Sequence, residues 1–144
     1  MVTAEDVIKK LDLAPHPEGG YYRRTYQNEG GSEARGRATS IYYFLEGTDF
    51  AKWHRTDGDE IWYWHAGAAL TLEIDLNHKG VQSYELGPDI FHGQAPQILV
   101  PADNWQRARS NGDWTLVSCM VSPGFLFESY ELIEDNEWHP DLNK

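Results

Sequence analysis

The sequence predicts an all-β fold, either a sandwich or a barrel. About nine or ten short segments rich in β-branched and aromatic residues follow one another at regular spacing, which is typical of such folds. Turn-forming residues separate them at positions 77–80, 87–89 and 111–113. Because strands do not alternate with long helices, an α/β fold is excluded. A chain of 144 residues suits one domain with a proper core.

The first expected element is a helix over residues 3–13. Thr3 is suited to the N-cap, and Asp6 lies three residues further on, which makes a variant of the capping box. Apolar side chains then recur on one face of the helix, and prolines at positions 15 and 17 end it. We expect this helix to pack on the outside of the main body.

The strands are expected after the glycine pair at positions 19 and 20. They fall at residues 21–26, 39–46, within 52–67, and at 68–76, 81–86, 97–101, 105–110, 114–121 and 125–133. This pattern divides the chain into a helix with its lead-in (1–17), a barrel (18–133) and a polar tail (134–144). No internal repeat or low-complexity segment interrupts it.

Charge and composition limit the classes of partner. The chain has 12 Lys and Arg against 23 Asp and Glu, a formal net charge of −11, and such a surface repels a phosphate backbone. Nucleic-acid binding is therefore not expected. No run of about 20 apolar residues or signal core is present, so we expect no membrane association and a cytoplasmic location. Four arginines (Arg23, Arg24, Arg35 and Arg37) form either a solvated loop or a local site for an anionic ligand.

One cysteine, Cys119, rules out an internal disulfide. It lies in the apolar run 115–121, where a buried, inert thiol is the favoured interpretation over a nucleophile.

The segment KWHRTDGDEIWYWHAG (52–67) carries the strongest chemical signal. Alternate side chains of a strand share a face, so Glu60, Trp62 and Trp64 should line one wall, with His54 reaching it across a short acidic loop. Histidine nitrogen and carboxylate oxygen are ligands for transition metals. The same pair also suits a general base and the group that orients it. A structural histidine held by a loop carboxylate is the third interpretation.

Two further stretches have both a structural and a functional interpretation. In residues 101–106 (PADNWQ), Trp105 and Gln106 enter a strand after a turn, either to pack a hairpin or to meet a ligand. In residues 122–127 (SPGFLF), Phe125 and Phe127 alternate, either to pack or to close an aromatic pocket.

These residues resemble the cupin superfamily of small β-barrels. Its first motif, G-x5-H-x-H-x3/4-E-x6-G, is matched by Gly47, His54, Glu60 and Gly67, with one extra residue before His54 and with Thr56 in place of the second histidine. Its second motif, G-x5-P-x-G-x2-H-x3-N, is matched by Pro101, whereas Asp103, Gln106 and Ser110 replace the glycine, histidine and asparagine. Two of the four metal-ligand positions of cupins are therefore matched.

The chain is most similar to the short cupin-five family, a domain of unknown function. The matching stretches are EGGYYRRTY (18–26), SIYYFLEG (40–47), residues 52–67, QILVPADNWQRA (97–108) and LVSCMVSPGFLFESYEL (116–132). The resemblance implies a cupin jelly-roll β-barrel (a double-stranded β-helix) and a homodimer. It also implies a fold similar to that of nucleotide-sugar epimerases, which work without metal.

Three functions follow for a small-molecule ligand in the barrel. The first is a metal-independent epimerase or isomerase acting on a carbohydrate, a nucleotide-sugar or a similar polar metabolite. His54 would be the base, Asp59 or Glu60 would orient it, and a tyrosine (Tyr42, Tyr63 or Tyr130) would return the proton. The expected ligand-binding residues are Tyr42, Trp62, Trp64, Gln97, Trp105, Gln106, Phe125 and Phe127.

The two alternatives are a non-catalytic binding module and a metal-dependent cupin. A binding module would use the same aromatic walls and polar anchors. A metal-dependent cupin would bind a divalent transition metal through His54, Glu60 and Gln106, a poor set because glutamine is a weak ligand. The favoured expectation is that no cofactor is needed.

Overall fold

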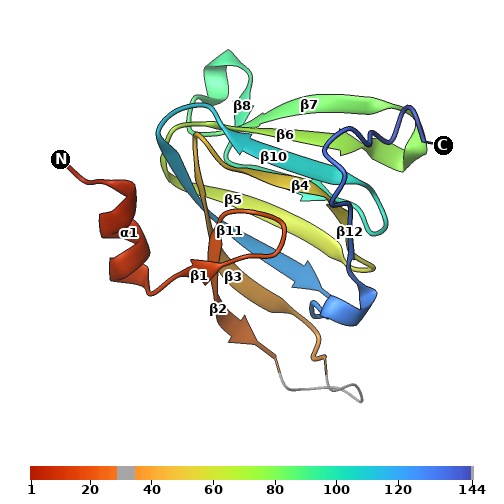
Figure 1. Ribbon diagram of the computed structural model, residues 1–144, viewed down its shortest axis with the longest axis horizontal. Coiled ribbons are helices and arrows are strands. Elements are labelled where there is room, and N and C mark those ends of the chain that lie inside the picture. The colour runs from red at the N-terminus through yellow and green to blue at the C-terminus, as the bar shows by residue number, and fades with distance from the viewer. Residues whose placement is uncertain (29–34, 144) are drawn as a thin grey trace.

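The protein consists of two facing β-sheets with a helix at one side (Figure 1). This computed structural model describes residues 1–28 and 35–143. The first six-stranded sheet has the order β1 (Ala14–Pro15), β2 (Tyr21–Gln27), β3 (Thr39–Glu46), β11 (Trp114–Ser122), β5 (Asp59–Gly67), β9 (Gln97–Val100). The second has the order β12 (Glu131–Leu132), β4 (Phe50–Arg55), β10 (Gln106–Ser110), β6 (Leu70–Asp75), β7 (Val81–Leu86), β8 (Gln94–Ala95).

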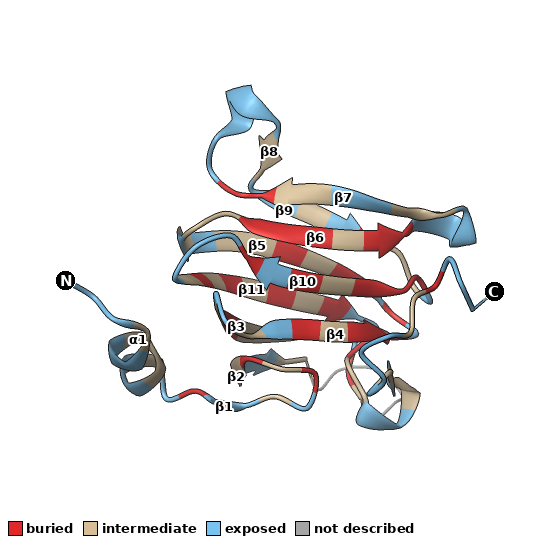
Figure 2. Cartoon of the chain, turned by 45° about the horizontal axis from the view of Figure 1, so that its top comes forward, coloured by how far each residue is buried: buried red, intermediate tan, exposed pale blue. Residues whose placement is uncertain are grey.

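Both sheets are antiparallel except for the β7–β8 pair, and together they form the expected jelly roll. The core lies between them, so buried positions alternate along β11, whereas β6 is buried along most of its length (Figure 2). It is built by inward side chains such as Leu72 and Ile74 from β6, Val117 from β11 and Trp62 from β5. Within the described residues, three 3-10 turns connect strands: η1 (Leu76–His78), η2 (Ile90–His92) and η3 (Phe127–Ser129).

The helix α1 (Ala4–Leu11) has the expected start but ends two residues early. The side chain of Thr3 accepts from the Asp6 N–H at 3.2 Å, and Asp6 accepts from the Thr3 N–H at 2.9 Å, so the capping box is confirmed. Asp12 ends the helix because its backbone takes the left-handed conformation, with φ of 55°. No residue of α1 is buried, and the helix stands beside the barrel in Figure 1.

The strand expected over residues 125–133 is mostly absent. After Ser122 the chain leaves the first sheet and crosses to the second, where only Glu131 and Leu132 pair with β4. Residues 123–130, called the crossing segment below, contain the turn η3. Residues 123–130 pass from one sheet to the other, so they cannot stay paired with a strand of either sheet. This segment instead covers one end of the barrel.

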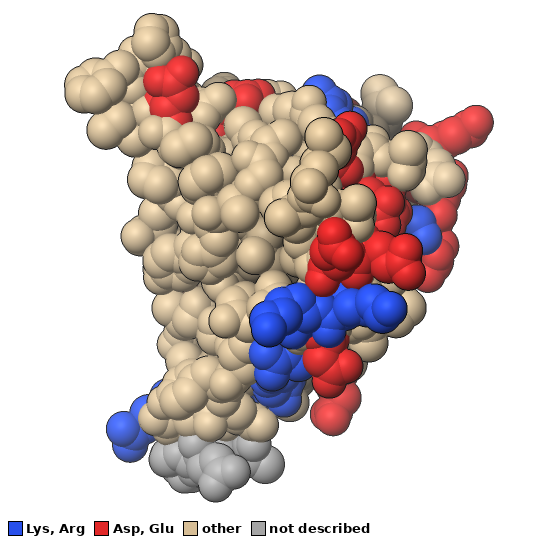
Figure 3. Space-filling model, turned by 90° about the vertical axis from the view of Figure 1, so that its left-hand side faces the viewer, with Lys and Arg blue, Asp and Glu red and all other residues tan. Residues whose placement is uncertain are grey.

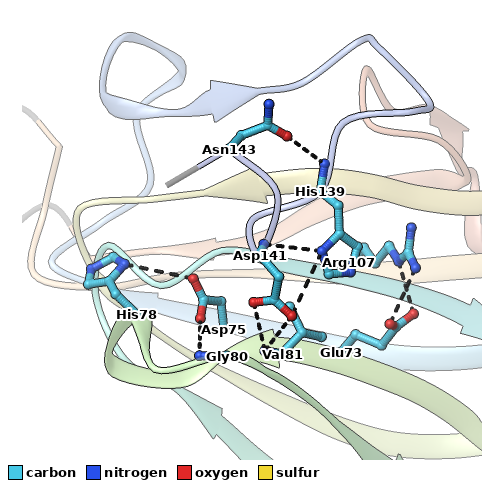
Figure 4. A network of polar contacts seen from close by, with 9 residues as sticks. All are labelled: Glu73, Asp75, His78, Gly80, Val81, Arg107, His139, Asp141 and Asn143. Carbon is cyan, nitrogen blue, oxygen red and sulfur yellow. Dashed lines mark hydrogen bonds and ion pairs between the residues drawn. The ribbon is translucent and has the colours of Figure 1, made fainter.

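The residues expected as a polar tail are packed against the barrel. The Trp138 ring lies edge-on to Trp105 with ring centroids 4.8 Å apart, and His139 lies 5.3 Å from the Trp53 ring. Asp141 accepts from the Val81 N–H at 3.2 Å (Figure 4). Hence the last residues hold the second sheet through both ring contacts and hydrogen bonds.

In the part of the chain that the structure describes, no helix is long and apolar enough to cross a membrane.

Candidate functional site

A small cavity opens at one end of the barrel, between the two sheets. The space open to the centres of water molecules in it is about 40 Å³, enough for roughly three water molecules. Its lining comes from the first sheet, from β4 of the second sheet, from the loop before β2 and from the crossing segment. The lining residues are His16, Glu18, Tyr22, Arg24, Thr39, Ile41, Tyr43, His54, Thr56, Glu60, Trp62, Cys119, Val121, Phe125, Phe127 and Tyr130.

His54 and Glu18 form the polar centre of this cavity. The Nδ1 of His54 lies 2.7 Å from the carbonyl oxygen of Lys52. Because a carbonyl only accepts, Nδ1 carries the hydrogen, and Nε2 is the nitrogen that can take up a proton. That Nε2 lies 3.5 Å from Oε2 of Glu18. The other carboxyl oxygen of Glu18 accepts a hydrogen bond of 3.0 Å from the Tyr130 hydroxyl.

A tight loop brings Glu18 to this place. The N–H of Gly19 donates to the carbonyl of His16 at 3.1 Å, and the N–H of His16 donates to the carbonyl of Gly20 at 2.9 Å. Both glycines have positive φ, 114° and 72°, a conformation that other residues rarely adopt. The N–H of Lys52 donates to the Glu18 carbonyl at 2.8 Å, which ties the loop to the strand that carries His54.

The buried side-chain amide of Gln106 forms a hydrogen bond with Glu60. The side-chain nitrogen of Gln106 donates to Glu60 Oε1 at 2.6 Å, and the oxygen of Gln106 accepts from the Trp62 indole N–H at 2.9 Å. Gln106 is 1% exposed, so both hydrogen bonds are shielded from water. The bridge fixes the Glu60 carboxyl beside the cavity, but Gln106 itself does not line it.

Burial sets the ionisation of these groups. It raises the pKa of Glu60 to about 7, against the opposing effect of nearby His54. It also raises the pKa of Glu18, and it lowers the pKa of His54, whose charged form Glu60 partly favours. Burial and the neighbouring Glu18 raise the pKa of Tyr130, which stays a neutral hydrogen-bond donor. Near neutral pH the cavity therefore holds groups poised both to accept and to donate a proton.

The crossing segment covers the cavity with aromatic rings. Phe125 and Phe127 meet edge-on with ring centroids 4.9 Å apart, and Phe125 lies 5.3 Å from the Tyr130 ring. The Phe127 side chain remains about half exposed, with 49% of its surface accessible. The pair thus forms part of the cavity wall and reaches the solvent.

The structure places several predicted site residues in the cavity and others outside it. His54, Glu60, Trp62, Phe125 and Phe127 line it. Their roles in binding or catalysis stay predictions.

Two residues that were expected at the site, Asp59 and Tyr42, lie on the face of their strand that points away from the cavity. Asp59 precedes Glu60 and therefore points outward, where its carboxylate accepts from the Ala102 N–H at 2.9 Å. Tyr42 precedes Tyr43 on β3 and also points outward, with the Arg23 guanidinium 5.6 Å from its ring centre. Adjacent residues of a strand cannot share a face, so the placement of both at the cavity is corrected.

Three others lie elsewhere in the barrel. Trp64 shares the inner face with Trp62 but packs against the core, where its indole N–H donates to the Ala68 carbonyl at 3.0 Å. Gln97 is exposed on β9. Trp105 packs beneath Trp138 with the Arg55 guanidinium 4.5 Å from its ring centre. Their expected places at the cavity are therefore also corrected, as is that of Tyr63, which does not line it.

Sequence reasoning missed His16 and Glu18. His16 looked solvent-facing among prolines, yet its side chain is 5% exposed, and its Nδ1 accepts from the Glu18 N–H at 3.1 Å. Only the double glycine that follows Glu18 signalled an unusual turn, and nothing local showed that this turn meets β4, more than 30 residues later. Tyr43, which donates to the Gly19 carbonyl at 2.6 Å, was also missed.

The four positions that the cupin motifs assign to metal ligands do not fit a metal in this arrangement. The Thr56 hydroxyl donates to the Gly58 carbonyl at 3.0 Å, and both polar atoms of Gln106 are engaged with Glu60 and Trp62. Among the described residues, no three His, Cys, Asp or Glu side chains are grouped to hold a metal ion. A metal bound by His54, Glu60 and Gln106 would have to share the amide oxygen of Gln106, which already accepts from the buried Trp62 indole.

A two-sheet jelly roll with a polar cavity between its sheets is the architecture of a cupin. The chain belongs to this superfamily, since the family model described as "Cupin superfamily (DUF985)" matches residues 5–133. This confirms the resemblance seen in the motifs. No curated protein matches the chain.

Solved structures support the same fold. Protein SO0799 from Shewanella oneidensis is 40% identical, with 92% of this chain and 85% of that chain covered and a TM-score of 0.87. A hypothetical protein from Leishmania major is 30% identical, with coverage of 92% and 88% and a TM-score of 0.84. Oxalate decarboxylase from Bacillus subtilis is 14% identical, with coverage of 85% and 30% and a TM-score of 0.64, which shows a shared fold alone.

Proposed function

We propose that the cavity binds a small polar metabolite and moves a proton on it, as a metal-independent isomerase or epimerase does. The observation that carries this proposal is that three buried ionisable groups (Glu18, His54 and Glu60) and the half-buried Tyr130 line one cavity. Burying ionisable groups is costly, and proteins retain such groups mostly where their chemistry is used.

His54 is the proposed base. Its Nε2 would take the proton from a carbon next to a carbonyl, and the C–H electron pair would move to the carbonyl oxygen to give an enolate. A protonated Glu60 or the Tyr130 hydroxyl would hydrogen-bond that oxygen.

In an isomerisation the attacked carbon carries a hydroxyl. The imidazolium would return the proton to the former carbonyl carbon while the hydroxyl proton passes to the former carbonyl oxygen, so the attacked carbon becomes the new carbonyl. In an epimerisation the Tyr130 hydroxyl or a water would protonate the opposite face of the same carbon as the carbonyl re-forms, and His54 would release its proton to solvent. Glu18, 3.5 Å from Nε2, would favour the charged imidazole formed in the step.

The size of the cavity favours short substrates. The cavity has room for roughly three water molecules, so only the reacting end of a nucleotide-sugar would enter. Short keto and hydroxy compounds therefore come before nucleotide-sugars in the search for a substrate.

Hydrogen exchange from heavy water tests the proposal. The protein is incubated in deuterated buffer near neutral pH with a panel of short keto acids, hydroxy acids, hydroxyketones and keto-sugars, and loss of the α-hydrogen signal is followed by NMR. We expect exchange with at least one compound and a fall of about 100-fold or more in the His54→Gln variant, which keeps most of the side-chain volume.

The His65→Ala variant is the matched control. His65 is an exposed histidine on β5, outside the cavity, and its Nε2 lies 2.6 Å from the Ser118 hydroxyl oxygen. The His65→Ala variant should catalyse hydrogen exchange at the wild-type rate. No exchange with any compound, or exchange that survives in His54→Gln, would reject the proposal.

A non-catalytic binding module is the second candidate, and the aromatic lining supports it. The rings of Tyr22, Tyr43, Trp62, Phe125, Phe127 and Tyr130 surround the cavity. Tight binding of a panel compound without exchange, equal in wild type and His54→Gln, would favour this function over the first.

A further inference from the structure

Arg24 stands apart from the other residues that line the cavity. Among those the structure describes, it is the one side chain there with a permanent positive charge. It alternates with Arg23 on β2, so the two arginines face opposite sides of the sheet. Arg23 points outward, with its Nε donating to the Leu11 carbonyl at 2.7 Å. Arg24 therefore brings a cation to the cavity.

No carboxylate among the described residues forms an ion pair with Arg24. Arg35, Arg55 and Arg107 each pair with a carboxylate, at 2.7, 3.0 and 2.9 Å respectively. On the face shown in Figure 3, Lys and Arg side chains likewise adjoin Asp and Glu side chains. The guanidinium of Arg24 makes no ion pair with a described residue, and its Nη1 donates to the side-chain oxygen of Gln27 at 3.3 Å.

The register of the sheet fixes where this cation lies. Arg24 pairs with Ile41, Ile41 with Cys119, and Cys119 with Trp62, and all four residues line the cavity. Three strand spacings separate the two ends of this row, roughly 14 Å between their Cα atoms. The short strand β1 pairs only with Tyr21 and Tyr22 of β2, so no described strand extends the sheet beyond Arg24. Arg24 thus lies at the rim of the cavity.

The two ends of the cavity differ in the chemistry that they would bind. At the rim, an exposed guanidinium offers a planar pair of N–H donors that matches two anionic oxygens. Inside, His54, Glu18 and Glu60 offer a proton acceptor and carboxyl groups that suit a neutral carbonyl or hydroxyl. An anionic group placed inside would meet the two buried carboxyls instead. A ligand should therefore enter with its neutral polar end first.

We propose that the ligand is a short carboxylate with a carbonyl or hydroxyl on the adjacent carbon, its carboxylate paired with Arg24 at the rim. This inference deepens the proposed function, since it names the class of compound for the same cavity. A carboxylate is favoured over a phosphate because it fits the guanidinium fork with less charge and volume near Glu18 and Glu60. A compound of this class also matches the small volume of the cavity.

Calorimetric titration of the purified protein tests the inference with defined probes. Glyoxylate, pyruvate and lactate are the carboxylates, lactamide is the neutral counterpart of lactate, and inorganic phosphate is the competing anion. We expect at least one carboxylate to bind, with its Kd raised tenfold or more in Arg24→Gln and partly restored in Arg24→Lys. Binding should also weaken with added salt, since Arg24 is exposed.

Arg23→Gln is the matched control, because it removes the same charge from the neighbouring outward position. It should bind as the wild type does, and lactamide should bind no better to wild type than to Arg24→Gln. Equal carboxylate binding by wild type and Arg24→Gln would overturn the inference, as would binding of phosphate but none of the carboxylates. Failure of hydrogen exchange with intact Arg24-dependent binding would reject only the proton-transfer function.

Discussion

At the scale of single residues, the ionisation of Glu60 links the site to stability. Its pKa of about 7 lies above its ordinary value of 4.5 because the carboxyl is buried. The folded protein therefore binds more protons than the unfolded chain between pH 4.5 and 7. Glu60 contributes stability that is fully present below pH 4.5 and is lost as the pH rises through 7. Burial lowers the pKa of His54, so this residue contributes stability that is present above pH 6.5 and is lost as the pH falls.

The Glu60→Gln variant isolates this effect. It keeps an oxygen to accept from Gln106 but cannot ionise. Relative to wild type, its free energy of unfolding should rise by on the order of 3 kcal/mol between pH 4.5 and pH 8, because the cost of ionising a buried carboxyl is removed. Urea unfolding at each pH measures the difference. Glu137→Gln, an exposed control, should change nothing, and a parallel pH profile for Glu60→Gln and wild type would refute the effect.

Part of the site was predictable at this scale because its signal is local. His54 and Glu60 lie six positions apart, and strand alternation correctly put Glu60 and Trp62 on one face. Asp59 was expected in the loop before the strand, but it is the first residue of β5, where alternation turns it away from that face. Glu18 and His16 reach the cavity through a loop that contacts β4 only in the folded chain. No local pattern specifies such a contact.

At the scale of elements, the turn before β2 positions Glu18. A Cβ on Gly19 would overlap the carbonyl oxygen of Phe50, at the start of β4. Positive φ and close backbone approach therefore both require glycine there. Gly80 has a similar φ, 118° against 114°, but a Cβ on it would meet nothing within 4 Å. The two glycines therefore share a similar φ and differ in how much space surrounds an added Cβ.

This pair gives a test of the turn. Gly80→Ala should cost about 1 kcal/mol for the left-handed backbone. Gly19→Ala should cost roughly 2 kcal/mol more, because the loop must move off β4, and it should lower ligand binding as Glu18 shifts. Denaturant unfolding and calorimetry measure the two effects. Equal costs for the two substitutions would show that the loop is not held against β4.

The strands were predictable where alternation is long. The segments expected at 39–46 and 114–121 match β3 and β11 to within a residue. Two-residue strands such as β1 and β8 carry no periodicity, so they were missed. The apolar run 125–133 was misassigned because its side chains cover the cavity end instead of joining a sheet. Turn η3 shows that aromatic content alone does not make a strand.

At the scale of the whole molecule, the homodimer and the cytoplasmic location stay predictions. Three features support the dimer. The eight residues of α1 are too few for a stable helix in water and bury no side chain within the chain. Leu99, on β9 of the first sheet, is 52% exposed. Figure 3 also shows a broad area without charged side chains beside the charged groups.

We expect light scattering at micromolar concentration to give a mass twice 16.5 kDa. Leu99→Asp should shift the mass toward that of the monomer if this surface forms the contact. A wild-type mass of 16.5 kDa would contradict the dimer.

The measurement that tests the central claim most directly is an NMR titration of the glutamate side-chain carboxyl carbons. The cavity keeps the buried Glu60 carboxyl close to its pKa near neutral pH, beside a neutral His54. We predict one carboxyl signal that titrates near pH 7, disappears in Glu60→Gln and shifts when a short carboxylate is added. If the Glu60 signal titrates near its ordinary value of 4.5 and ignores every such probe, the cavity is not the acid–base site described here.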